Sequence, residues 1–419
     1  MTLPQPNLHA AGFADLRLAV VSPFVDRRHG TERALAELLE RLARDYGCQI
    51  HLYAQRVEDL ELIDLQSARS SKSGFISWHK VPSIPGPHAV RFLAWIVLNG
   101  FLRKWSALFG GVSFDLVLSP GINCLHPDAV IVHALFHRLQ ELTRDEKENP
   151  ALRGNFFRRL HRRVYYGLLA AMERRIYTDK TVTLAAVSQR TAALLEVYFH
   201  RQEVCVIPNG VDTAFFSPAA RLARRADSRQ RRGLRDEDFV LLLIGNGWQV
   251  KGLATLLESM AALPGLPLKL LIVGDDAAES FRAHAARLGV QERCRWENSS
   301  CDVLDFYAVA DVYASPSHED SFGLPVAEAM ACGLPVITSV FAGVADCIHD
   351  GVDGYVIREP RDARTLAHLI ERLKEDLDLR LHMGEAAAKT MLQWNWNRNA
   401  AAVWELLRVI DTKRASSDS

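Results

Sequence analysis

The chain has 419 residues, of which 48% are hydrophobic and 24% are charged. This length exceeds one ordinary domain of about 100–200 residues and suits two domains, each with its own core. The 50 basic and 50 acidic residues cancel, which argues against non-specific binding of nucleic acid. The longest apolar run, residues 92–98, is shorter than the roughly 20 residues that cross a bilayer, so we expect no membrane-spanning helix.

Cysteine usage and the start of the chain indicate a cellular compartment. Seven cysteines are scattered along the sequence, and none forms a C-x-x-C pair, as is typical of a reduced, cytoplasmic protein. Residues 16–21 are apolar, short and rich in strand-forming residues, and no basic segment precedes a longer apolar run. We therefore expect a first strand there and not a secretion signal.

Strand-like and helix-like segments alternate along the first half, which predicts a parallel sheet covered by helices. These segments are LRLAVVSP (16–23), ERALAELLERLARDYG (32–47), QIHLYA (49–54), DLVLSP (115–120), AVIVHAL (129–135) and TLAAVS (183–188). The alternation restarts at FVLLLI (239–244) and continues through LKLLIVG (268–274) and DVYASPS (311–317) to PVITS (335–339). The sequence thus predicts two doubly wound α/β domains.

The boundary between the two domains is predicted near residue 205. Residues 221–238 (RLARRADSRQRRGLRDED) are polar and dense in charge, as expected of a linker or a solvated surface segment. The predicted divisions are 1–205, 206–385 and a final helical segment, 386–419. Doubly wound sheets bind ligands at the carboxyl ends of their strands, so two such domains would face a central cleft that holds the active site.

Residues 318–333 (HEDSFGLPVAEAMACG) are predicted to be a loop and a short helix at the carboxyl end of a strand. Pro325 suits the first helical turn and Gly333 the helix exit. A helix amino terminus attracts anions, so an anion is expected beside Gly323 and Leu324. Because the nearby Asp320 and Glu328 would accept hydrogen bonds from sugar hydroxyls, the combination indicates a nucleotide sugar.

An alternative interpretation keeps these carboxylates structural, with Asp320 as a helix cap and Glu328 as a solvated acid in the first turn. Residues 301–350, however, carry eight acidic residues and no Lys or Arg. An acidic stretch without compensation is costly, which favours a functional role.

The segment PSHEDSFGLPVAEAMACGLPVITSVFAGVADCIHDGVDGYVI (316–357) resembles the donor site of retaining GT-B glycosyltransferases, in particular family 4. HGTERALAELLERLA, VSQRTAALLEVY, VIPNGVDTAFF and GNGWQVKGLATLLESM resemble further family motifs in the same order. The resemblance implies two Rossmann-like domains and transfer of a hexose with retained anomeric configuration to a carbohydrate or lipid-linked acceptor. It also implies no metal cofactor and a last helix, within 386–419, that crosses back to the first domain.

The resemblance also implies roles for individual residues. Glu328 would bind the ribose and Asp320 the donor sugar, while Lys251 would neutralise the leaving diphosphate. The family has a glutamate at the position of Asp320, so Glu319 is the alternative contact to the sugar. The implied donor-binding set is Gly30, Asn246, Gly247, Lys251, Glu319, Ser321, Phe322, Gly323, Leu324 and Glu328. Many relatives carry an arginine shortly before the lysine, and this chain has none there.

In the first domain, His133 matches the family histidine that faces the donor sugar and the acceptor. Its expected role is to orient and polarise the reacting groups. His137 is the nearby alternative. A histidine after a strand is also commonly a packed side chain, so the assignment of His133 rests on the resemblance.

Two segments are candidate anchors on the inner face of an anionic membrane. Residues 151–180 combine basic and aromatic side chains, and residues 90–110 include the longest apolar run. The alternative is helix packing with a solvated arginine face.

Metal chemistry is not expected, because the D-x-D patterns at 236–238 and 376–378 are interpreted as solvated surface. A nucleotide-sugar 2-epimerase and a non-catalytic nucleotide-sugar binding protein are the other candidate functions.

Overall fold

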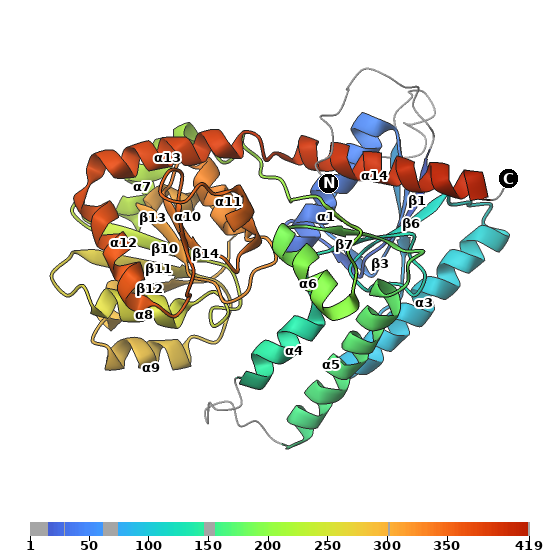
Figure 1. Cartoon of the computed structure of the whole chain (residues 1–419), viewed down its shortest axis with the longest axis horizontal. Helices are drawn as coiled ribbons and strands as arrows, with labels where there is room; N and C mark the ends of the chain where they lie inside the picture. Colours follow the sequence, from blue (N-terminus) through green and yellow to red (C-terminus); the bar gives the residue numbers. More distant parts are fainter. Residues whose placement is uncertain (1–15, 29, 62–73, 146–155, 301, 418–419) are drawn as a thin grey trace. The chain divides into compact units, whose positions relative to one another are not determined.

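The computed structural model describes residues 16–28, 30–61, 74–145, 156–300 and 302–417. They form two compact units (Figure 1): unit 1 contains residues up to Pro208 together with 397–419, and unit 2 contains Asn209–Trp396. The divisions predicted from the sequence fall after residues 205 and 385. Residues 386–396 group with unit 2 because α13 (Leu377–Met391) packs there against α11 (Leu324–Ala331).

Unit 1 is built on a seven-stranded parallel sheet in the order β5-β3-β1-β6-β7-β8-β9. Its strands are β1 (Arg17–Val21), β3 (Gln49–Ala54), β5 (Phe75–Lys80), β6 (Leu116–Pro120), β7 (Ala129–Val132), β8 (Thr183–Ala186) and β9 (Val204–Val206), with a small pair formed by β2 (Phe24–Val25) and β4 (Arg56–Val57). Its helices are α1 (Gly30–Tyr46), α3 (His88–Phe109), α4 (Phe136–Asp145), α5 (Phe156–Tyr177), α6 (Gln189–Phe199) and α14 (Trp396–Ser417).

Helices cover both faces of this sheet, as the alternating pattern predicted. Buried side chains of α3, α5 and α6 pack against one face, where they form a cluster with strand residues such as Val130 and Leu184. Helices α1 and α14 lie on the opposite face (Figure 1) and contact each other through the rings of Tyr46 and Trp404. Arg414 near the end of α14 pairs with Asp128 at 2.8 Å, so the last helix is fixed to unit 1.

Unit 2 contains a six-stranded parallel sheet in the order β12-β11-β10-β13-β14-β15. Its strands are β10 (Phe239–Ile244), β11 (Leu268–Val273), β12 (Cys294–Glu297), β13 (Val312–Ser315), β14 (Val336–Ser339) and β15 (Tyr355–Ile357). Its other helices are α7 (Pro218–Arg231), α8 (Leu253–Ala261), α9 (Glu279–Arg287), α10 (Leu304–Val309) and α12 (Ala363–Glu375), with short 3₁₀ turns at Gln291–Arg293 and Gly343–Cys347.

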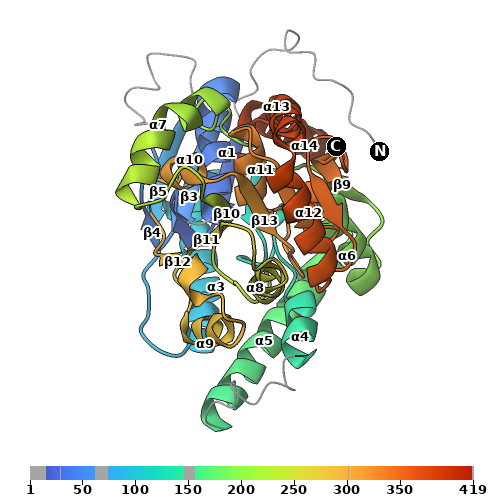
Figure 2. The same ribbon diagram turned by 90° about the vertical axis from the view of Figure 1, so that its left-hand side faces the viewer.

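This second sheet is also doubly wound. Helices α8, α9 and α12 form one layer, and their apolar side chains share a core with β10 and β11. Helices α7, α10, α11 and α13 form the other layer (Figure 2). The strand order changes direction at β10, and in doubly wound sheets ligands bind near such a point, at the carboxyl ends of the strands. The predicted fold class, two Rossmann-like α/β domains, is confirmed.

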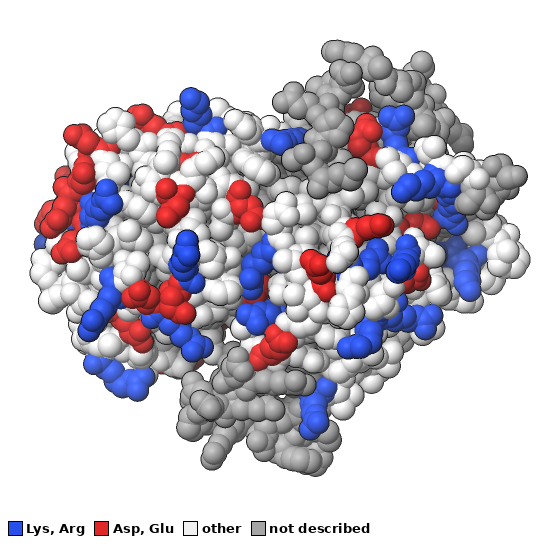
Figure 3. Space-filling model, in the orientation of Figure 1, with Lys and Arg blue, Asp and Glu red and all other residues white. Residues whose placement is uncertain are grey.

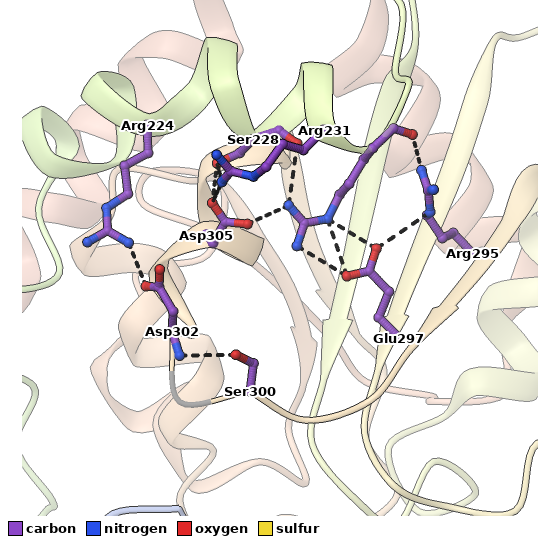
Figure 4. Close-up of polar contacts among 9 residues, drawn as sticks. Arg224, Ser228, Arg231, Arg295, Glu297, Ser300, Asp302 and Asp305 are labelled. Carbon is purple, nitrogen blue, oxygen red and sulfur yellow. Dashed lines mark hydrogen bonds and ion pairs between the residues drawn. The ribbon is translucent and has the colours of Figure 1, made fainter.

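The interpretation of residues 221–238 as a linker or solvated segment was wrong. Ser217 caps α7 by accepting a hydrogen bond from the Ala220 amide, and Pro218 occupies the first helical position, so a helix starts there. Arg232, just after the helix, pairs with Asp305 at 2.6 Å and Glu297 at 3.1 Å. Figure 4 shows these two acids together with Arg224 and Arg231 of α7. The charged segment is therefore bound to α10 and β12.

The same contacts correct the idea of an uncompensated acidic stretch. Arg224 pairs with Asp302 at 2.5 Å, and Arg231 pairs with Asp305. Arg225 pairs with Asp311 at 2.6 Å. The balancing cations lie 73 to 86 residues earlier in the chain and are brought together with the acids only by folding. The acid count alone thus carried less weight for function than expected.

The two D-x-D patterns differ in their surroundings. Asp376 and Asp378 are exposed, and Asp376 caps α13, so the solvated interpretation is correct for this pair. Asp238 is only 3% exposed and accepts a hydrogen bond from the Arg235 amide at 2.8 Å, so that interpretation was wrong for Asp238. Its carboxylate closes the turn that leads into β10.

Candidate functional site

Loops at the carboxyl ends of three neighbouring strands of unit 2 are joined by hydrogen bonds. The His318 amide, after β13, donates to the Val250 carbonyl after β10 at 2.7 Å. The Asp320 amide donates to the Phe341 carbonyl after β14 at 3.0 Å. These loops contain most of the residues that the sequence analysis selected, and the fold brings them to one edge of the sheet.

The short helix of the predicted anion site is α11, and it starts where expected. Gly323 is its N-cap residue with a φ of 92°, a backbone conformation that favours glycine. Leu324 and Pro325 open the helix, and Gly333, with a φ of 72°, follows its end. The amides at the start of a helix have no partner within the helix, so they can bind an anion. Because Gly323 is the cap, the alternative role of Asp320 as the helix cap was wrong.

Lys251 is held at the edge of the same site. Its Nζ atom lies 2.8 Å from Oδ2 of Asp320, and the side chains are 13% and 20% exposed. Burial by itself lowers the pKa of Lys251, but attraction by Asp320, together with Tyr313 and Asp276, outweighs burial and leaves the pKa raised. The ammonium group therefore stays charged.

The absence of a side chain at Gly245 leaves room for the side chain of Lys251. A Cβ atom on Gly245 would lie 2.8 Å from Cε of Lys251, so the lysine side chain crosses the space above this glycine. The Lys251 amide donates to the Gly247 carbonyl at 2.9 Å, and Gly247 has a φ of 77°. Sequence reasoning included Gly247 and missed Gly245, although a glycine directly after a buried strand is the signal that could have identified it.

Glu328 lies on α11 and is only 3% exposed. Its Oε2 atom accepts a hydrogen bond from the hydroxyl of Tyr307 on α10 at 2.7 Å. Burial raises the pKa of Tyr307 well above its usual value, and the charge of Glu328 adds to the shift, so this tyrosine remains a donor. The alternative of a solvated acid was wrong, and Tyr307 is a partner that the sequence analysis did not find.

The remaining residues of the predicted donor set lie in the same loops or in unit 1. Asn246 accepts a hydrogen bond from the Asp275 amide at 2.8 Å, which ties the loops after β10 and β11 together. Phe322 is buried, and its carbonyl accepts from the Val344 amide at 2.6 Å. Glu319 and Ser321 are partly exposed beside Asp320. Gly30 opens α1 and belongs to unit 1.

Two histidines follow β7 in unit 1 and differ in their surroundings. His133 directly follows the strand, and burial lowers its pKa to about 4, so it is neutral at ordinary pH. Nδ1 of His137 lies 2.6 Å from Oε2 of Glu173 on α5. Glu173, which is completely buried, also accepts hydrogen bonds from the amides of Phe136 and His137 and so caps α4. Sequence reasoning missed Glu173.

Among the residues that the structure describes, no group of three or more His, Cys, Asp or Glu side chains is arranged to hold a metal ion. Within that same part of the chain, no helix combines the length and the apolar character that crossing a membrane requires.

Family models match both halves of the chain. Residues 28–215 match the model described as Glycosyltransferase Family 4, and residues 224–390 match the model described as Glycosyl transferases group 1. Among curated proteins, a D-inositol 3-phosphate glycosyltransferase from Salinispora arenicola (strain CNS-205) is 31% identical over 217 residues, which is 48% of each chain. The chain spans about half the length of the curated relatives it matches.

Solved structures extend the likeness over nearly the whole chain. The crystal structure of WaaG, a glycosyltransferase involved in lipopolysaccharide biosynthesis, aligns with a TM-score of 0.74 and 21% identity over 92% of this chain and 99% of WaaG. That of Anabaena Alr3699/HepE in complex with UDP-glucose aligns with a TM-score of 0.68 and 17% identity over 94% and 100%. At these identities the likeness establishes the GT-B fold. The amino-terminal half of the chain thus matches Glycosyltransferase Family 4, and the carboxyl-terminal half matches the glycosyl transferases group 1 family.

Proposed function

We propose that this protein is a retaining, metal-independent glycosyltransferase that moves a hexose from a nucleoside diphosphate sugar to a carbohydrate or lipid-linked acceptor. One observation carries the proposal: a partly exposed lysine, a buried carboxylate and the start of a helix converge at the carboxyl edge of the unit 2 sheet. The names of the relatives, and the UDP-glucose bound to HepE, support the same activity.

The diphosphate of the donor would bind between Lys251 and the amides that open α11. When the anomeric bond breaks, negative charge builds up on the leaving diphosphate. A fixed ammonium group and fixed N–H groups stabilise that charge without having to reorganise. Lys251 is suited to this because Asp320 already holds its side chain in place.

The carboxylates would bind hydroxyl groups of the donor. Tyr307 occupies one oxygen of Glu328, which fixes the orientation of this carboxylate for the ribose hydroxyls. For the hexose, Asp320 and its neighbour Glu319 remain the two candidates. Asp320 already accepts a hydrogen bond from Lys251, and a carboxylate has further lone pairs for a sugar hydroxyl.

Among the histidines of unit 1, His133 suits a role that needs no charge. Because its pKa is low, it can orient or polarise a hydroxyl group as a neutral imidazole but cannot act as a standing cation. We propose that a phosphate oxygen of the leaving group, on the same face of the sugar, helps to deprotonate the acceptor.

Incubation with labelled nucleotide sugars tests this function. We expect release of the nucleoside diphosphate with the sugar transferred or hydrolysed, at a rate that EDTA does not change. A changed sugar that still carries its nucleotide would identify an epimerase instead. Saturable binding without any turnover, in the presence of acceptor extracts, would identify a binding protein.

We also propose that unit 1 contacts an anionic membrane surface, and that α3 is the contact. Large apolar side chains spaced three or four residues apart form a stripe along this helix, with exposed fractions from 49% to 75%. They are Val90, Leu93, Val97, Phe101, Trp105, Leu108 and Phe109. Such a stripe is costly in water, and the acyl boundary of a bilayer would cover it.

Charge favours a lipid partner over an apolar protein surface. Residues 65–114 contain six Lys and Arg and no Asp or Glu. Over α3 the surface is mostly uncharged or basic (Figure 3). Anionic headgroups attract such a surface.

For the described part of α5, packing against neighbouring helices is a better interpretation than membrane anchoring. Its Tyr165 contacts Phe92 and His88 of α3, with ring centroids 6.4 and 5.9 Å apart. Residues 151–155 of the predicted anchor lie outside the described residues.

Vesicle flotation tests the role of α3. We expect binding to phosphatidylcholine vesicles that contain phosphatidylglycerol, at physiological salt, and a loss of about tenfold or more in the Phe101→Ser/Trp105→Ser variant. Val197→Ser is the matched control, because Val197 is an exposed apolar residue on α6. Absence of binding even at low salt would refute the membrane contact.

A further inference from the structure

The pair of Lys251 and Asp320 has a second consequence for the donor site. Asp320 is fixed at its backbone: its amide donates to the Phe341 carbonyl, and its own carbonyl accepts from the Gly343 amide at 2.9 Å. Its carboxylate therefore cannot move far from the Lys251 ammonium, 2.8 Å away. The side chain of Lys251 runs across Gly245 to reach this carboxylate.

The negative charges around the ammonium weaken its attraction for an anion. Asp320 pairs with Lys251 directly, and the carboxylate of Asp276 also lies within electrostatic range of it. Asn246, in the same loop, is neutral, and its side-chain oxygen is occupied by the Asp275 amide. A diphosphate that reaches Lys251 must therefore share it with a carboxylate that repels phosphate.

We propose that Asp320 is a positioning residue that holds Lys251 in place for the donor and at the same time lowers the affinity of the site for free nucleoside diphosphates. This inference rests on the proposed function, since it assigns the diphosphate of the donor to Lys251. The consequence is faster release of the nucleoside diphosphate product. A lysine without a carboxylate partner would instead retain the nucleoside diphosphate.

Asp320 can distinguish the donor from the product because the charge of the diphosphate changes during the reaction. In the intact donor the diphosphate is esterified at both ends, whereas the product carries an additional negative charge at its free end. Repulsion from Asp320 grows with that charge, because the interaction energy of two charges scales with their product. Asp320 therefore disfavours the product more than the donor.

Isothermal titration of nucleoside diphosphates and nucleotide sugars tests this role. The proteins compared are the wild type, Asp320→Asn, Lys251→Met and the double variant. Asparagine keeps an oxygen that can accept from Lys251, so the lysine stays in place while the negative charge disappears. We expect Asp320→Asn to bind the free nucleoside diphosphate about tenfold more tightly. In the Lys251→Met background the same change should alter affinity less than about twofold, because the coupling has been removed.

Two further variants serve as a control for net charge and as an independent test of the position of Lys251. Asp378→Asn removes an exposed acid on α13 and is expected to leave nucleoside diphosphate affinity within about twofold, which controls for net charge. Gly245→Ala places a methyl group where Lys251 passes, so it should weaken nucleoside diphosphate binding with Asp320 intact. It supplies an independent test should Asp320→Asn fail to fold.

The outcomes separate this inference from the proposed function. If Asp320→Asn binds the free nucleoside diphosphate no more tightly than the wild type and loses affinity for the nucleotide sugar alone, Asp320 acts on the sugar and the positioning role is refuted. If Gly245→Ala binds as tightly as the wild type, the geometry argued for Lys251 is refuted. A wild-type protein that binds neither nucleoside diphosphates nor nucleotide sugars would contradict the proposed function itself.

Discussion

At the scale of single residues, the proposed donor site depends on the ends of α11 and on one pair of charged side chains. Pro325, Gly323 and Gly333 have fixed conformational preferences, so the start and end of α11 could be read from the chain. The pairing of Lys251 with Asp320 spans 69 residues and depends on how two loops meet. No local pattern contains that information.

The burial of Glu328 illustrates the same limit. The spacing of the family motif places a carboxylate on α11, but its partner Tyr307 comes from a different helix. Only the packing of α10 and α11 shows that the carboxylate is buried and oriented. Sequence reasoning therefore left a solvated acid open as an alternative.

The first prediction concerns turnover. Lys251→Ala and Glu328→Ala should each lower kcat by about ten- to a hundredfold or more, because each removes a charged contact to the transition state or to the bound donor. Steady-state kinetics with the identified nucleotide sugar measures this loss. Near-normal rates in both variants, at unchanged thermal stability, would refute the site.

At the scale of helices and strands, the alternating pattern predicted most elements, because buried parallel strands are near-continuous apolar runs. Helix α7 escaped prediction because its segment is arginine-rich, which reads as solvated surface. The arginines are instead satisfied by acids on and around α10 and on β12. Hydrophobic periodicity within a segment does not predict ion pairs with residues far away in the sequence.

The second prediction concerns this arginine network. Arg232 is 11% exposed and pairs with Asp305 and Glu297, so Arg232→Ala leaves largely buried acids with less compensation. We expect unfolding free energy to fall by about 2 kcal/mol or more. Arg224→Ala removes an exposed pair and should cost less than about 1 kcal/mol. Urea denaturation compares the two, and equal losses would contradict the distinction.

The third prediction concerns pH and the sheet of unit 1. His51 on β3 is 8% exposed, and its Nδ1 atom lies 2.9 Å from Nε2 of His79 on β5. Burial lowers the pKa of His51 to about 4, with the positive charges of His79 and Arg17 adding to the shift. As the pH falls, His51 therefore takes up a proton at a higher pH in the unfolded chain than in the folded protein.

The sign of the effect follows from that order. Stability should be full above the unfolded pKa, near pH 6.5, and should decrease as the pH falls toward about 4. We expect the wild type to lose about 1–2 kcal/mol more over this range than His51→Asn does. His126→Asn, at an exposed position, is the control. Identical pH profiles for the wild type and His51→Asn would contradict the assignment.

At the scale of the whole molecule, the charge is divided between the two halves. Residues 1–200 carry 25 basic and 19 acidic residues, and the remainder carries 25 and 31. A basic first half suits the proposed contact of α3 with anionic lipid, while the proposed donor site lies in the acidic second half. Sequence arithmetic could indicate this division, but the exposed stripe of α3 became visible only when its buried face was known.

In the proposed mechanism, the diphosphate of a nucleotide sugar binds between Lys251 and the start of α11. A crystal structure of the wild-type protein, grown with a nucleotide sugar that it binds in isothermal titration, would test this placement. We expect electron density for the diphosphate within hydrogen-bonding distance of the Lys251 ammonium and of the Gly323 or Leu324 amide. Well-defined donor density elsewhere on the molecule, with the start of α11 unoccupied, would contradict it.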